Sequence, residues 1–253
     1  MITNAYIHEY GNGKLEPEHF DVKTVLESRG VNCELFTTKR LSRNQLTFNE
    51  STLVVGNHPI IETVFKRLKY INCTNSYPIV LRPYLKRNIW ESSIRKILIQ
   101  SHNKDSLNVF IKPKNRTKLF TGFVLKSNQD LFKLESIPKN TDLYCSTVVE
   151  WLSEYRVFIN NSKIVGIKNY EGDTNLTLDM KEVESAISAF EQSEDRTSAY
   201  SLDFGILIDG STALIEWNDG FALGSYGLDK EVYTDLILSR WNEILKNVFD
   251  HKS

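Results

Sequence analysis

Carboxylate and amide side chains interrupt an otherwise apolar pair of strands in "SLDFGILIDGSTALIEWNDG", residues 201–220. The turn at 209–210, Asp-Gly, predicts a hairpin that brings Asp203 close to the level of Glu216. Because side chains two apart in a strand face the same side, Glu216 and Asn218 point together and Trp217 points away. Three oxygen ligands on one sheet face suit Mg²⁺, which completes its shell with phosphate and water. We therefore predict a magnesium site at Asp203, Glu216 and Asn218; the alternative is a hairpin end exposed to water.

Two fragments match protein kinases, but the rest of the kinase pattern is missing. Asp203-Phe204-Gly205 has the form of the kinase metal-binding tripeptide, and "VFIK", ending at Lys112, has the form of its ATP-binding lysine. The residues before Lys112, "SHNKDSLNVFI", contain no glycine, and the chain has no His-Arg-Asp. A kinase needs both a glycine-rich loop and that catalytic loop. What remains is a lysine after a strand and carboxylates on a distant hairpin, a combination that holds Mg-ATP in several folds.

The elements that must position these residues are predicted to form an α+β protein. Residues 1–85 alternate short strands with helical patterns, which predicts a small α/β layer with some parallel pairing. Helical spacing predicts a helix over 87–98, with Arg87 and Trp90 in its first turn. Alternating runs over 107–172 predict one antiparallel sheet of four or five strands. A helix capped by Asp179, the hairpin and a helix over 230–249 follow.

Composition and charge exclude other classes of protein. No apolar run approaches the roughly 20 residues that span a bilayer, so we expect no membrane partner. The widely spaced Cys33, Cys73 and Cys145 fit neither a disulfide framework nor a zinc site. Residues 1–17 lack a secretory pattern, and we expect a cytoplasmic protein. The net charge is -1, with the basic excess in residues 1–100. That segment lacks the interleaved aromatic residues of nucleic-acid stacking platforms, which argues against nucleic acid as a partner.

In the order and spacing of its motifs, the chain resembles the ATP-grasp superfamily of ATP-dependent carboxylate ligases over residues 77–227. The motifs are "VFIKP", "KLFTG", "VVEWLSEYRVFI" and "YSLDFGILIDGSTALIEWNDGFALGSYG". The chain is most similar to a clade of small ATP-grasp proteins named for one arginine and two lysines. The resemblance implies an ATP-grasp fold in which two α+β subdomains grip ATP, preceded by a small N-terminal α/β subdomain. The corresponding domains are residues 1–85, 86–150 and 151–253.

The resemblance also implies roles for individual residues. It assigns Arg156 to stabilising a phosphate or acyl phosphate, with Lys168 on the next strand as a second catalytic candidate. It assigns the magnesium ions to the three hairpin residues named above. It assigns ATP to Lys112, Lys118, Glu150, Trp151, Leu152 and Glu154. Simpler interpretations stay open: the lysines as solvated surface charges, and Arg156 as the ion-pair partner of Glu154.

The implied reaction activates a carboxylate with ATP as an acyl phosphate and joins it to an amine, releasing ADP and phosphate. The carboxylate belongs to an amino acid, a peptide or a protein. We expect this acceptor where the metal hairpin meets the N-terminal layer, with Arg82, Arg87 and Gly224 as substrate-binding residues. The alternatives are a non-catalytic ATP-binding or scaffolding protein and, with less support, a kinase-like phosphotransferase.

Overall fold

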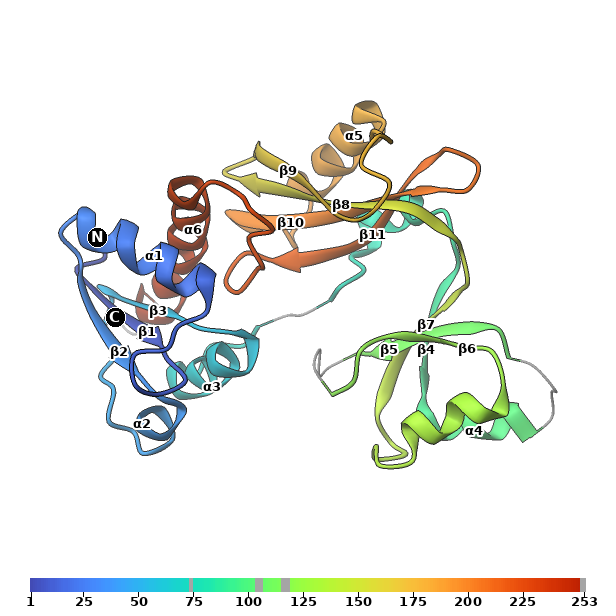
Figure 1. The fold of residues 1–253 in the computed structure, drawn as a ribbon, viewed down its shortest axis with the longest axis horizontal. Coiled ribbons are helices and arrows are strands. Elements are labelled where there is room, and N and C mark those ends of the chain that lie inside the picture. The colour runs from blue at the N-terminus through green and yellow to red at the C-terminus, as the bar shows by residue number, and fades with distance from the viewer. Residues whose placement is uncertain (73–74, 103–106, 115–118, 251–253) are drawn as a thin grey trace.

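The computed structural model describes residues 1–72, 75–102, 107–114 and 119–250. Three sheets organise these residues: a three-stranded N-terminal sheet, a four-stranded middle sheet and a four-stranded C-terminal sheet. Figure 1 shows the N-terminal sheet and its helices on the left, the C-terminal sheet at the top and the middle sheet at the lower right. Helices and antiparallel sheets are both substantial, so the predicted α+β class is confirmed. None of the helices in the described ranges is long and apolar enough to cross a membrane.

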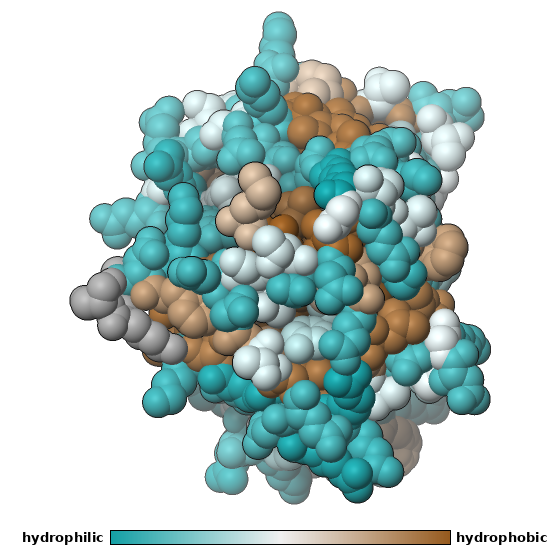
Figure 2. All heavy atoms as spheres, turned by 90° about the vertical axis from the view of Figure 1, so that its left-hand side faces the viewer, coloured by the Kyte–Doolittle hydropathy of each residue, from teal (hydrophilic) through white to brown (hydrophobic). Residues whose placement is uncertain are grey.

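The N-terminal sheet is parallel, as the alternation of strands and helices predicts. Its order is β2-β1-β3, with β1 in the middle pairing in parallel on both sides. The strands are β1 (Asn4–His8), β2 (Asn32–Phe36) and β3 (Thr52–Val55), and the helices are α1 (Pro17–Ser28), α2 (Thr38–Ser42) and α3 (His58–Leu68). The Asn57 side chain accepts a hydrogen bond from the backbone N–H of Ile60 and caps α3. The face that this unit turns to solvent is mainly hydrophilic, with separate hydrophobic areas (Figure 2).

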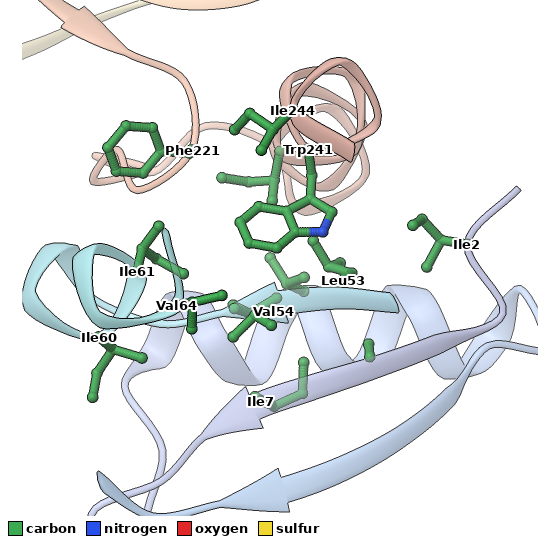
Figure 3. Packing of buried hydrophobic residues seen from close by; sticks show 14 of the residues in the cluster. Ile2, Ile7, Leu53, Val54, Ile60, Ile61, Val64, Phe221, Trp241 and Ile244 are labelled. Carbon is green, nitrogen blue, oxygen red and sulfur yellow. The ribbon is translucent and has the colours of Figure 1, made fainter. Parts of the chain in front are cut away.

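The last helix, α6 (Lys230–Phe249), packs on the N-terminal sheet, whose strands lie far from it in sequence, and also contacts the C-terminal sheet. Trp241 is 1% exposed, and its indole N–H donates to the backbone carbonyl of Thr52 at 2.8 Å. Figure 3 shows Trp241 and Ile244 of α6 lying over Leu53 and Val54 of β3. The N-terminal core therefore depends on a helix that the predicted domains place within 151–253. Those domain boundaries stay a prediction.

The middle sheet has the order β4-β7-β5-β6 and is antiparallel throughout. Its elements are β4 (Ile89–Ser93), α4 (Ile94–His102), β5 (Val109–Pro113), β6 (Phe123–Leu125), η2 (Asn128–Leu134) and β7 (Asp142–Thr147). The predicted helix over 87–98 is wrong in its first half, because residues 89–93 form β4 and the helix begins at Ile94. Trp90 pairs with Cys145 of β7, and the residue is 41% exposed. Strand pairing thus overrides a helical spacing that the sequence shows by chance.

The C-terminal sheet has the order β11-β10-β8-β9, and α5 (Met180–Glu191) and η1 (Ile79–Leu85) contribute to the core on one of its faces. The strands are β8 (Trp151–Asn160), β9 (Lys163–Gly172), β10 (Ala199–Leu207) and β11 (Thr212–Asp219). The single sheet predicted over 107–172 is therefore wrong: its strands belong to two sheets, separated at residues 148–150. Alternating hydrophobicity identifies strands but does not say which strands pair. The Asp179 cap of α5 is confirmed by its hydrogen bond from the Lys181 backbone N–H.

Candidate active site

The β10–β11 hairpin brings the three predicted metal ligands together. Asp203 lies directly opposite Glu216 in the antiparallel register, at the level predicted from the turn. A register irregularity follows Asp203, where the ladder shifts before Phe204. The Asn218 amide donates to Asp203 Oδ2 at 3.2 Å. Trp217 packs in the opposite direction, against the α5 side of the sheet, where it contacts Phe190.

Both carboxylates of the predicted metal site are paired with a cation from another strand. Arg156 on β8 lies opposite Asp203 and holds it in a bidentate contact, Nε to Oδ1 at 2.8 Å and Nη2 to Oδ2 at 2.6 Å. Lys112 on β5 forms an ion pair with Glu216, which joins the middle sheet to the C-terminal sheet. The Lys112 ammonium also lies 4.5 Å from the centre of the Tyr77 ring. For Arg156 and Lys112 the simpler interpretations are thus not what the structure shows: Arg156 pairs with Asp203 rather than Glu154, and the Lys112 side chain is only 15% exposed.

The pKa values of these groups follow from burial and pairing. Burial lowers the pKa of Lys112, but the charge of Glu216 outweighs it and holds that pKa above its ordinary value. Burial raises the pKa of Glu216, yet Lys112 brings it below its ordinary value. Burial raises the pKa of Asp203 to about 6, against the opposing effect of Arg156. At neutral pH the site therefore holds two cations and two carboxylates.

A cavity of about 860 Å³ lies beside the Lys112–Glu216 pair, between the middle and C-terminal sheets. Its walls include Phe110, Lys112 and Val124 from the middle sheet and Trp151, Glu154 and Tyr170 from the C-terminal sheet. Cavities of this size with apolar walls and a few polar groups hold cofactor-sized ligands. A buried ammonium and aromatic rings in its walls suit a ligand with a flat ring and a polyphosphate.

Of the residues expected at ATP, the structure brings Lys112, Trp151 and Glu154 to this cavity. The Glu154 carboxylate accepts a hydrogen bond from the Tyr170 hydroxyl at 2.9 Å, and burial raises its pKa. Glu150 is exposed, and neither it nor Leu152 is among the lining residues, although both flank Trp151. Lys118 lies outside the described residues.

Gly205 makes room for the Trp151 indole. A Cβ atom at this position would lie 2.3 Å from Cε3 and 2.8 Å from Cζ3 of Trp151, closer than atoms can approach. Glycine on β10 therefore lets the ring lie flat on the neighbouring strand and form a wall of the cavity. This gives the third residue of the kinase-like tripeptide a packing role that has no connection with a kinase switch.

The two arginines expected at the substrate lie elsewhere. Arg87 lines the large cavity, 5.4 Å from the Trp151 ring, and donates to the backbone carbonyls of Leu214 and Ile215 at 2.6 Å each. Arg82 is exposed on η1. The structure thus does not bring either of them to the junction of the hairpin and the N-terminal layer. The basic motif "RPYLKR" does not determine the direction in which each arginine side chain points.

Gly224 does lie at that junction, in the wall of a second cavity of about 460 Å³. This cavity adjoins the first one, because Ser76 and Asn218 line both, and Arg156 lies in its wall. Lys168 on β9 is directly opposite Arg156 in the register and is half-buried. Sequence reasoning missed Tyr77, Tyr170 and Ser76, since isolated tyrosines and serines carry no motif.

The donor set of the hairpin fits magnesium in its chemistry. Within the described ranges, no group of three or more His, Cys, Asp or Glu side chains is placed to hold a metal ion. Asp203, Glu216 and Asn218 instead offer two carboxylates and one amide, all of them oxygen donors. Mg²⁺ takes few protein oxygens when phosphate and water fill the rest of its shell. The set therefore suits a metal that arrives with a polyphosphate.

Two antiparallel α+β units that enclose a cavity with a buried lysine, beside an N-terminal parallel layer, define an ATP-grasp protein. The chain belongs to this group: residues 84–236, more than half of its length, match an ATP-grasp domain family, the second family of the clade named for one arginine and two lysines. The resemblance inferred from the motifs is thereby confirmed. No curated protein sequence matches the chain significantly.

Solved structures with a similar fold include two ligases and a macrocyclase. The D-alanine–D-alanine ligase from Bacillus anthracis has a TM-score of 0.57 at 11% identity, covering 99% of both chains. The ATP-grasp ligase PsnB, complexed with a minimal precursor, has a TM-score of 0.53 at 10% identity, covering 94% of this chain and 100% of that one. The macrocyclase MdnC from Microcystis aeruginosa MRC, bound with the precursor peptide MdnA, has a TM-score of 0.52 at 11% identity, covering 93% and 99%. At these identities the likeness is one of fold.

Proposed function

We propose that the protein is an ADP-forming ligase that joins a carboxylate to an amine, with an amino acid, a peptide or a protein as substrate. The observation that carries this proposal is the meeting of two ion pairs, Lys112–Glu216 and Arg156–Asp203, at the boundary of two adjoining cavities. The large cavity has the volume and the aromatic walls for ATP. The smaller one gives a second reactant access to Arg156. We also propose a cytoplasmic location, because the reaction requires ATP.

The proposed roles follow from these positions. Lys112 and Arg156 would bind phosphate oxygens of ATP, with Lys118 and Lys168 as further cations. Trp151 and the neighbouring Glu150, Leu152 and Glu154 would bind the nucleoside.

Asp203, Glu216 and Asn218 would hold Mg²⁺. When bound, this ion neutralises negative charge on the phosphates during transfer of the phosphoryl group. Within the protein each of the two cations neutralises one of the two carboxylates: Lys112 pairs with Glu216, and Arg156 pairs with Asp203. Binding of Mg-ATP would replace these ion pairs: the two cations would bind phosphate oxygens, and the two carboxylates would bind the metal ion.

The proposed reaction has two steps. A carboxylate oxygen of the substrate attacks the γ-phosphorus of ATP, the bond to the β,γ-bridging oxygen breaks, and ADP leaves with an acyl phosphate remaining. The amine nitrogen then attacks the acyl carbon, the bond to the phosphate oxygen breaks, and phosphate leaves as the nitrogen loses a proton. Positively charged side chains stabilise the transferring phosphoryl group, which is where such sites gain most of their rate.

The test is to incubate the protein with Mg-ATP and pools of amino acids or peptides and to identify the products. We expect ADP and phosphate in a substrate-dependent manner, and no turnover in Lys112→Met. AMP and pyrophosphate would refute the acyl-phosphate route. ATP binding without turnover in any pool would favour a non-catalytic ATP-binding protein instead.

A further inference from the structure

The smaller cavity lies where three parts of the chain meet. Its walls come mainly from the start of α1, the end of β3 with residues 55–58, and the end of β11 with the segment that follows it, residues 217–224. Phe221, Leu223 and Ile237 supply apolar surface. The cavity opens towards the proposed phosphate site because Arg156 and Asn218 line it. A molecule bound here would lie beside Arg156, which is proposed to bind a phosphate of ATP.

Most charged groups facing this cavity are already neutralised within the protein. Arg156 is held by Asp203, and Asp219 is held by Arg240 in a bidentate contact at 2.6 and 2.8 Å. His58 lies 3.4 Å from Glu62 on its own helix.

The carboxylates of Glu16 and Glu18 are different. Glu16 accepts a hydrogen bond from the Tyr10 hydroxyl at 2.6 Å, and Glu18 accepts one from the Ser225 backbone N–H at 3.3 Å. No cation of the described residues forms an ion pair with either. The cavity therefore has an uncompensated negative charge.

His19 adds an acceptor to the same wall. The residue is only 7% exposed, and its Nδ1 lies 3.2 Å from the backbone carbonyl of His8. A carbonyl only accepts, so Nδ1 carries the proton and Nε2 of the neutral ring presents a lone pair. No partner for Nε2 is found in the described part of the chain, and His19 lines the cavity. Burial lowers the pKa of His19, which favours this neutral form.

We propose that this cavity binds the amine substrate as a primary ammonium ion, with Glu16 and Glu18 as its counter-charges and His19 Nε2 as a hydrogen-bond acceptor. An ammonium has three donors and no acceptor, which matches two carboxylates and one imidazole lone pair. Before its nitrogen can attack the acyl carbon, the ammonium must lose one proton, which a carboxylate or the imidazole lone pair of this wall can accept. The apolar surface takes a short aliphatic or aromatic group attached to the amine. As a site for the amine reactant this inference rests on the proposed ligase function, whereas the binding of ammonium itself can be measured without ATP.

The test uses the full chain with labelled histidine, titrated at neutral pH with butylamine, 1-butanol and butyrate while the His19 Cε1–H signal is followed. We expect a saturable shift with butylamine and a weaker one or none with the other two. Glu16→Gln and Glu18→Gln should each weaken butylamine binding about tenfold, the usual effect of one hydrogen bond to a charged group. The matched control is Glu27→Gln, an exposed carboxylate on the same helix that pairs with Lys23.

Three results would overturn the inference: no saturable shift with butylamine, equal affinity for butanol, or affinity unchanged in both glutamine variants. Glu16 and Glu18 are only half-buried, so both variants should fold, and if one of them does not, the other decides the outcome. If the protein binds butylamine but shows no ligase turnover, that result would count against the proposed function and not against the ammonium site. If the protein shows ligase turnover but does not bind ammonium in this cavity, the proposed function would stand and only this site would be refuted.

Discussion

Replacing Arg156 by methionine should destabilise the protein strongly, because it leaves the Asp203 carboxylate buried without a cation. The two side chains are 10% and 4% exposed, so solvent screens their interaction little. Two hydrogen bonds at 2.8 and 2.6 Å would be lost at once. Breaking a buried pair by removing one partner costs about 3–5 kcal/mol, in contrast to about 0–1 kcal/mol for an exposed pair. We expect the free energy of unfolding of Arg156→Met to fall by about 3–5 kcal/mol at pH 7.

Removing the second partner as well should restore most of this loss. In Arg156→Met with Asp203→Asn, neither position leaves an unpaired buried charge, and we expect a net loss of about 1–2 kcal/mol. Urea unfolding of the four proteins of this double-mutant cycle, followed by tryptophan fluorescence, measures the coupling. Lys163→Met, at an exposed position of β9, is the control and should change the stability by less than about 0.5 kcal/mol.

A loss below about 1 kcal/mol in the single variant, or no recovery in the double variant, would refute the buried pair.

Three further predictions concern binding and stability. Lys112→Met should weaken the binding of Mg-ATP about tenfold or more, measured by calorimetry, whereas Lys133→Met, an exposed lysine, should not. Burial lowers the pKa values of His8 and His19, so the unfolded chain takes up protons below about pH 6.5 that the folded chain does not. Stability should therefore fall with decreasing pH by up to about 1.4 kcal/mol per pH unit for each histidine, and a flat urea midpoint between pH 7 and 5 would contradict this. Trp241→Ala should cost about 3–5 kcal/mol and expose the N-terminal core to hydrogen exchange; protection of β1 and β3 at the original level would show that α6 is dispensable.

The sequence by itself determined the features that depend on neighbouring residues. The turn at 209–210 and the two-residue period of strands predict that Asp203, Glu216 and Asn218 meet, since a hairpin fixes its own register. The Asp179 cap and the helix over 230–249 follow equally from local signals. The order of the motifs identifies the ATP-grasp class for the same reason, because each motif is a short local pattern.

Only the tertiary structure decided which distant segments pair. Glu154 and Arg156 share a face of β8, but two positions along a strand separate them by about 7 Å, whereas a neighbour directly across the sheet lies about 5 Å away. Arg156 therefore pairs with Asp203. In the same way, an amphipathic period shows that α6 has an apolar face but not that the N-terminal sheet covers it. The cavities arise from such long-range contacts, and for that reason no local pattern in the chain predicts Glu16, His19 and Arg156 in one wall.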